Sequence, residues 1–187
     1  MIGYHGVITT SVGGTQYIYA LGNATTSTVY KATIDTSGNI GTFSTTSQGQ
    51  LGQAAYALWT TNLTISGTQY VYVTGGKNAS EYSSVYKATI DSSGNIGAFA
   101  TTSQAQLPAI LAFHSGAATS IGGTNYIYIL GGQSSGTNVS TLYKATVDSS
   151  GNIGAFSTTS QGQLPVAMTN QNSNKHKGKR LFLHFNL

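Results

Sequence analysis

Apolar and polar residues alternate along several short stretches of this chain, and clusters of small polar residues separate these stretches. The clearest example is GTQYIYALGN, which begins at Gly14, and close variants of it begin at Gly67 and Gly123. Alternation with a period of two predicts β-strands with one buried face, and the flanking glycines predict tight turns. The pattern therefore predicts an all-β protein built from short strands.

A second block of sequence follows each of these strands and is almost the same in all three places. It reads VYKATIDTSGNIGTFSTTSQGQL from Val29, and near copies of it begin at Val85 and Leu142. Repeats of about this length are typical of propellers and solenoids. We therefore divide the chain into three repeats, residues 1–52, 53–107 and 108–165, and a basic tail, residues 166–187.

Each repeat is expected to form a four-stranded antiparallel meander. In the third copy the alternation and the turn residues predict strands at residues 115–121, 125–130, 141–147 and 153–159. The turn before the last strand contains Gly151, which is free to adopt a positive φ.

The order of sequence features within each repeat resembles the kelch repeat over about residues 4–165. Two copies have a strand that ends in a glycine pair, a variable loop follows, and then come a tyrosine-bearing strand and a later aromatic residue. Phe stands at that aromatic position, where the kelch repeat usually has Trp. The resemblance implies a β-propeller-like array of three four-stranded antiparallel blades. The matching residues are Gly75-Gly76 and Gly131-Gly132, then Tyr30, Tyr86 and Tyr143, then Phe43, Phe99 and Phe156.

Three blades leave the array incomplete, or closing by oligomerisation, because closed propellers typically contain four to eight blades. Three arrangements stay open: part of a longer propeller, a homodimer that completes a six-bladed ring, or an open arc. The ending from residue 170 shares neither composition nor period with the repeats, which indicates a truncated or frame-shifted reading frame.

Charge and composition narrow the classes of function. The formal charge is +4, but residues 1–174 hold four Lys and four acidic residues, so the excess lies in the tail and a nucleic-acid-binding face is not expected. There is no Cys, no stretch long enough to span a membrane, and no secretory signal at the start. The low charge and the abundant Thr, Ser and Tyr are typical of an extracellular or cell-surface protein.

The candidate ligand-binding residues lie in the segments that differ most between the copies, residues 23–28, 77–83 and 133–140. Insertions in propellers often carry binding, so we expect ligand contacts from Lys77, Glu81, Tyr82 and Asn138. The alternative is that these loops vary because nothing constrains their sequences.

Asp35, Asp91 and Asp148 begin three nearly identical turns. An Asp followed by Ser, Gly and Asn has some likeness to a calcium loop. A simpler interpretation is that the carboxylate accepts hydrogen bonds from the amides of its own turn, since one carboxylate per loop is few for calcium.

Lys31, Lys87 and Lys144 also recur at equivalent positions, and a ring of them would bind anions. The alternative is that each packs its stem along a neighbouring blade and places its ammonium near the Asp four residues later. His5 and His114 are equivalent as well. They would hold a metal if they converged, but a structural role is the simpler expectation because the second copy lacks a matching His.

These observations predict a non-catalytic binding or scaffolding module without a cofactor, whose partner is a protein or a glycan. The four acidic residues comprise one Glu and three turn Asp, which disfavours a glycosidase, and the sole Arg180 disfavours a sialidase. The lack of Cys excludes the copper-radical oxidases of the kelch fold, which use a Cys-linked Tyr. Part of a mutarotase-like enzyme and a purely structural spacer remain as alternatives.

Overall fold

The computed structural model describes residues 5–169, and within this range all regular structure is β-strand. The all-β expectation is therefore confirmed. Three antiparallel sheets of three strands follow one another along the chain, with one small hairpin between the last two strands of the third sheet. Sheet 1 contains β1 (Gly6–Val12), β2 (Thr15–Leu21) and β3 (Val29–Ile34); sheet 2 contains β4 (Trp59–Ile65), β5 (Thr68–Thr74) and β6 (Val85–Ile90); sheet 3 contains β7 (Ser115–Ile121), β8 (Thr124–Leu130) and β11 (Leu142–Val147); the hairpin is β9 (Gln133–Ser134) and β10 (Thr137–Asn138).

The three sheets have the same internal register. In each sheet the second strand lies in the middle and pairs with both of its neighbours. Tyr19 lies opposite Lys31 in sheet 1, and the corresponding Tyr and Lys lie opposite each other in sheets 2 and 3. Because side chains alternate between the faces of a strand, equivalent residues lie on the same face of each sheet.

The predicted fourth strand of each unit is wrong. In sheet 3, residues 153–159 make only two isolated bridges to β11, from Ile153 to Val147 and from Ser157 to Lys144. Three residues separate the bridges on the outer segment and two on β11, so one extra residue interrupts the ladder, as in a β-bulge. The same spacing occurs in sheets 1 and 2. Each unit is thus a three-stranded sheet with a loosely attached outer segment.

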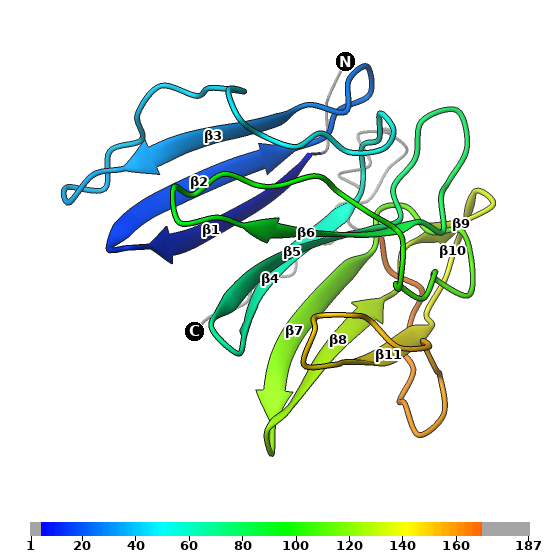
Figure 1. Ribbon diagram of the computed structural model, residues 1–187. Coiled ribbons are helices and arrows are strands. Elements are labelled where there is room, and N and C mark those ends of the chain that lie inside the picture. The colour runs from blue at the N-terminus through cyan, green and yellow to red at the C-terminus, as the bar shows by residue number, and fades with distance from the viewer. Residues whose placement is uncertain (1–4, 170–187) are drawn as a thin grey trace.

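The sheets stand side by side, with their first strands adjacent. β1 lies beside β4, and β4 lies beside β7 (Figure 1). The approach of β7 to β4 is close: a Cβ on Gly116 would lie 2.7 Å from the Trp59 ring, so only glycine fits there. Within residues 5–169 the three sheets form an open array and not a closed propeller.

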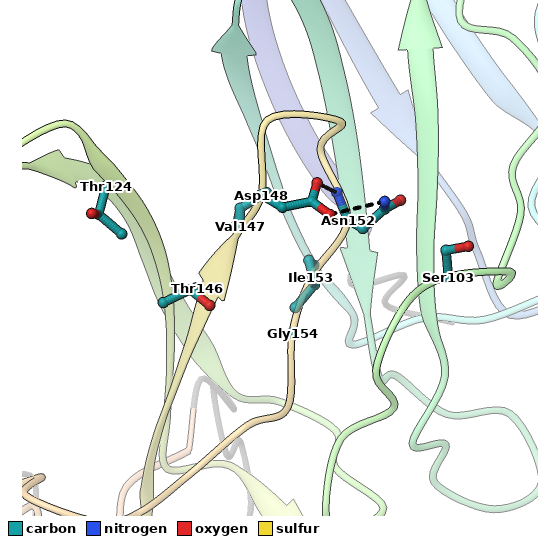
Figure 2. Close-up of a pocket in the computed structure, with 8 residues that line it drawn as sticks. All are labelled: Ser103, Thr124, Thr146, Val147, Asp148, Asn152, Ile153 and Gly154. Atoms are coloured by element: carbon teal, nitrogen blue, oxygen red, sulfur yellow. Dashed lines mark hydrogen bonds between the residues drawn. The ribbon is translucent and has the colours of Figure 1, made fainter.

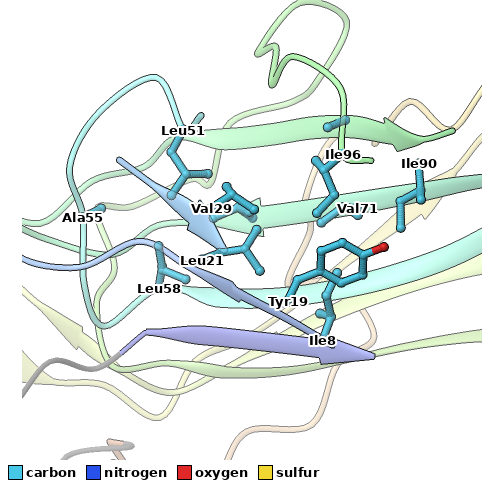
Figure 3. Close-up of a cluster of buried hydrophobic side chains, with 12 residues drawn as sticks. Ile8, Tyr19, Leu21, Val29, Leu51, Ala55, Leu58, Val71, Ile90 and Ile96 are labelled. Atoms are coloured by element: carbon cyan, nitrogen blue, oxygen red, sulfur yellow. The ribbon is translucent and has the colours of Figure 1, made fainter. Parts of the chain in front are cut away.

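Two hydrophobic cores fill the spaces between successive sheets. We call the face of a sheet that carries Tyr19 or its equivalent the forward face, and the opposite face the rear face. In the first core Tyr19, Leu21 and Val29 of the forward face of sheet 1 pack against Val71 of the rear face of sheet 2 (Figure 3). Val73 of the same rear face belongs to this core as well. Burial of each such aliphatic side chain contributes about 1.5–3 kcal/mol, so these cores are the main source of stability.

The second core repeats the first one between sheets 2 and 3. Tyr72 and Val85 of the forward face of sheet 2 pack against Ile127, Ile129 and other residues of the rear face of sheet 3. Sheets 1 and 2 therefore use their forward faces against the next sheet, and sheets 2 and 3 use their rear faces against the preceding one.

Hydrogen bonds join the forward faces of sheets 1 and 2 to the Asp turn of the next sheet. Tyr19 Oη donates to the carbonyl of Gly94 at 2.7 Å, and Tyr72 Oη donates to that of Gly151 at 2.8 Å. Both glycines have a positive φ, as predicted for Gly151. Burial raises the pKa of both phenols.

A lysine and a glutamine complete the same contact. Lys31 Nζ lies 2.6 Å from Asn95 Oδ1, and Gln48 Oε1 accepts from the backbone amide of Ile96 at 3.0 Å. Lys87 and Gln104 repeat these bonds onto Asn152 and Ile153. We call the Tyr, Lys and Gln of one sheet, with the turn that they bind, the clamp. Each of these two lysines therefore reaches the turn of the next sheet and not, as we expected, the Asp four residues later.

The tyrosine of the clamp offers a direct test of this contact. Replacement of Tyr72 by Phe keeps the ring but leaves the buried Gly151 carbonyl without its donor, so we expect a loss of about 1–2 kcal/mol in the free energy of unfolding. The measurement is urea unfolding followed by circular dichroism. Tyr70→Phe is the control, because Tyr70 packs on the same glycine but its hydroxyl makes no hydrogen bond within residues 5–169. Equal losses in both variants would contradict the clamp.

Candidate functional site

The three variable loops lie at one end of the array. Residues 23–28, 77–83 and 133–140 join the second strand of each sheet to the third, at the end opposite the β1–β2, β4–β5 and β7–β8 hairpins. In Figure 1 they occupy the upper and right-hand side, whereas the hairpins and the Asp turns point to the left and downward. We call these loops together the loop surface.

Lys77 and Glu81 are brought together, as their shared loop allows, but they bind each other. Lys77 Nζ lies 3.3 Å from Glu81 Oε1, and the Glu81 side chain is only 9% exposed. The same Nζ lies 5.9 Å from the centre of the Phe113 ring, which packs edge-on against Tyr56. This Lys77 cluster fastens the loop of sheet 2 to the linkers that precede β4 and β7.

Tyr56 and Phe113 were missed as members of this cluster. They lie in linkers between the sheets and do not occupy equivalent positions in their copies, so no repeat pattern marks them. The backbone of Tyr56 holds the loop as well, because it bridges to Lys77. The amide of Phe113 donates to the carbonyl of Ala57 at 2.8 Å, which joins the two linkers to each other.

Tyr82 and Asn138 lie in different surroundings. The backbone of Tyr82 pairs with Leu111, and its ring packs against the first core, so it serves mainly to hold the loop. Asn138 lies in β10, pairs with Gln133 and is exposed. Of the four predicted contact residues, Asn138 is thus the one that faces solvent, and it is not part of the Lys77 cluster.

The loop of sheet 1 is shaped by its first residue. Asn23 Oδ1 accepts from the amides of Thr25 and Thr26, both at 2.7 Å, and its amide nitrogen donates to the Thr26 hydroxyl. This is an Asx turn, in which a side chain imitates the backbone. The three loops are therefore held in different ways: the loop of sheet 1 by this Asx turn, that of sheet 2 by the Lys77 cluster, and that of sheet 3 by the β9–β10 hairpin.

The Asp turns have the hydrogen-bonded geometry that we expected of them. Asp148 Oδ1 accepts from the amides of Ser150 and Asn152, and Oδ2 accepts from the Asn152 side chain (Figure 2). Asp35 and Asp91 make the same bonds. Hydrogen bonds from the Asn of each turn hold the pKa of these carboxyls below its usual value. Within residues 5–169 no three His, Cys, Asp or Glu side chains are grouped as a metal would need.

A hollow of about 630 Å³ lies beside the last of these turns (Figure 2). Thr124, Thr146 and Ser103 line it together with Asp148 and Asn152. The single carboxylate is already held by its own turn, so the hollow offers hydroxyl groups but no pair of ionisable groups for acid–base chemistry.

The two equivalent histidines do not converge on a metal site. His114 is buried between sheets 2 and 3, and its Nε2 lies 2.9 Å from the Thr74 hydroxyl, whereas Nδ1 has no partner within residues 5–169. His5 is exposed. Burial lowers the pKa of His114 to about 4, so its ring is neutral near pH 7. This environment agrees with the structural role that we expected.

No protein-family model matches the chain, and the comparison with curated proteins found no match. Residues 5–169 contain no apolar helix of membrane-spanning length.

The buried histidine predicts how stability depends on pH. The pKa of His114 is about 4 in the folded chain and about 6.5 when unfolded, so the unfolded chain takes up the proton first as the pH falls. The free energy of unfolding is therefore highest above pH 6.5 and falls as the pH drops toward 4. The loss amounts to about 2 kcal/mol by pH 5. Urea unfolding at pH 7 and pH 5 measures this loss.

His114→Leu is the matched control, because Leu58 stands at the equivalent position in sheet 2. The variant should lose most of the difference between pH 7 and pH 5. The turn carboxyls should contribute little in this window, because their pKa values are lowered and they titrate at more acidic pH. A variant with an undiminished difference would show that another group is responsible.

Proposed function

We propose that this chain is a kelch-like β-propeller segment that acts as a non-catalytic binding scaffold. Its ligand contacts would come from the loop surface. The observation that carries this proposal is the gathering of the three variable loops at one end of an array whose sheets are otherwise alike.

The distribution of sequence differences among the three copies supports a constant scaffold with variable binding loops. The residues of the clamp are the same or closely similar in all three copies, whereas residues 23–28, 77–83 and 133–140 differ in sequence and in the device that holds them. A rigid array with differing loops at one end is a common design for binding, because the scaffold can stay constant while the contacts vary.

The chemistry of the loop surface favours binding over catalysis. Its charged side chains in the described range are Lys77 and Glu81, which neutralise each other. The exposed positions at the loop tips are small or amide-bearing, among them Asn78, Ser80, Thr137 and Asn138. Such groups offer hydrogen bonds to the hydroxyls of a carbohydrate or to the backbone of a protein, and either ligand suits a protein of the cell surface.

The test is binding to two kinds of probe, an array of glycans and a library of displayed peptides. We expect a reproducible ligand in one of them. A double variant, Asn78→Ala with Asn138→Ala, removes two exposed amides from the loop tips and should weaken that binding at least about tenfold, the equivalent of about 1.4 kcal/mol.

Thr15→Ala with Thr68→Ala is the control, because both residues are exposed at the opposite end of the sheets. This variant should bind as the unchanged chain does. Binding that is lost in the control but kept in the loop variant would place the site elsewhere. The absence of any ligand among both kinds of probe would argue for a spacer.

A further inference from the structure

One position of the rear face is buried in two sheets and exposed in the third. Ile96 in sheet 2 is 0% exposed and Ile153 in sheet 3 is 2% exposed, whereas the equivalent Ile40 in sheet 1 is 52% exposed. The difference follows from the order of the sheets, because sheet 1 has no preceding sheet in the described range to cover its rear face.

The forward face shows the opposite trend. Ile65 in sheet 2 is 5% exposed, and the equivalent Ile121 in sheet 3 is 58% exposed. Tyr128 is likewise partly exposed, although the equivalent Tyr19 and Tyr72 are fully buried. The forward face of sheet 3 is thus an uncovered copy of a face that is covered in sheets 1 and 2.

Other exposed apolar side chains gather on the rear side of sheet 1. On the rear side of sheet 1 Val7, Tyr30, Ile40 and Phe43 are all at least 38% exposed. Phe99 and Phe156, the equivalents of Phe43, contribute to the first and second cores. Exposed patches of this kind mark interaction surfaces.

The polar groups of the clamp are also present but unused at both ends. Within residues 5–169 Tyr128 Oη and Lys144 Nζ donate no hydrogen bond to another sheet, and Asn39 Oδ1 accepts none. Charge is complementary as well. Hydrogen bonds from Asn95 and Asn152 chiefly lower the pKa of Asp91 and Asp148, and Lys31 and Lys87 of the preceding sheets lower these pKa values further. Asp35 has no such lysine in the described range, which leaves Lys144 and Asp35 as the unmatched pair.

We propose that a second copy of this chain docks head to tail on these faces, with sheet 3 of each copy packed on sheet 1 of the other. Two copies joined in this way form a closed ring of six sheets, within the four to eight of closed propellers. The new contacts repeat the clamp: Tyr128 Oη to the Gly38 carbonyl, Lys144 Nζ to Asn39 Oδ1, and Gln161 Oε1 to the Ile40 amide.

A second copy fits these faces because the chain already joins the same two faces twice. The contact of sheet 1 with sheet 2 and that of sheet 2 with sheet 3 use equivalent residues for the core and for the clamp. The occupant of the forward face of sheet 3 must therefore present an Asp turn followed by an apolar residue, and sheet 1 of a second copy does so. This proposal is independent of any ligand at the loop surface.

The first test is the mass in solution, measured by light scattering over a range of concentrations. We expect a discrete species of twice the 19.4 kDa chain mass.

Ile40→Lys and Ile121→Lys each place an ammonium where the contact would bury it, and each should raise the dissociation constant about 100-fold or more. Ile110→Lys is the matched control, because Ile110 is exposed but lies in the linker before β7, outside both faces. It should behave as the unchanged chain does.

Mixing the two impaired variants tests the head-to-tail arrangement itself. In the mixture, sheet 3 of the Ile40→Lys chain meets an unaltered sheet 1 on the Ile121→Lys chain, so one intact contact re-forms. The mixture should therefore recover the double mass that each variant alone has lost. The recovery also shows that both variants are folded.

Three results would overturn the proposal. One is a single-chain mass for the unchanged chain at every concentration, even if a chain shortened to residues 1–169 associates. Another is an indefinite polymer, which would exclude closure by two copies. The third is a mixture that stays at the single-chain mass while circular dichroism shows both variants folded.

Discussion

A three-stranded sheet with two apolar faces can bury each face only against another element, and at both cores of residues 5–169 that element is the neighbouring sheet. The chain has no described helix to cover a face, and its strands carry aliphatic or aromatic residues on both sides. The packing of a forward face on a rear face is therefore the contact on which the structure depends. The cores supply most of its free energy. The clamp fixes the register between sheets, since Tyr19 and Lys31 can reach the turn of sheet 2 in only one alignment.

Much of this fold is visible in the sequence because it depends on local patterns. Alternation identified the three strands of sheet 3 to within about a residue, and Gly151 marked its turn correctly. The fourth strand was wrong because residues 153–159 still alternate, while the extra residue between Ile153 and Ser157 interrupts their pairing. Alternation within one segment does not show how many residues of the neighbouring strand lie opposite it. The partner of Lys31 was missed for a similar reason, because it lies in the next sheet.

The candidate site was less predictable than the fold. Repeat comparison pointed to the variable loops, which do lie at one end, and Lys77 and Glu81 share a loop as their spacing implies. It gave no signal for Tyr56 and Phe113, because a residue that occurs in a single copy has no pattern to reveal it. The sequence also did not show whether Asn138 is exposed. Its exposure depends on the β9–β10 hairpin, in which Asn138 pairs with Gln133.

Sheets 1 and 2 each cover the Asp turn of the next sheet, and amide hydrogen exchange at three equivalent positions reports this coverage. The amides of Ile96 and Ile153 donate to Gln48 and Gln104 of the preceding sheets, whereas within residues 5–169 the amide of Ile40 has no such acceptor. Measured by NMR in dilute solution, the first two should exchange far more slowly than that of Ile40, which should become protected as the concentration rises. Equal and rapid exchange at all three positions would show that the sheets do not cover the turns in solution.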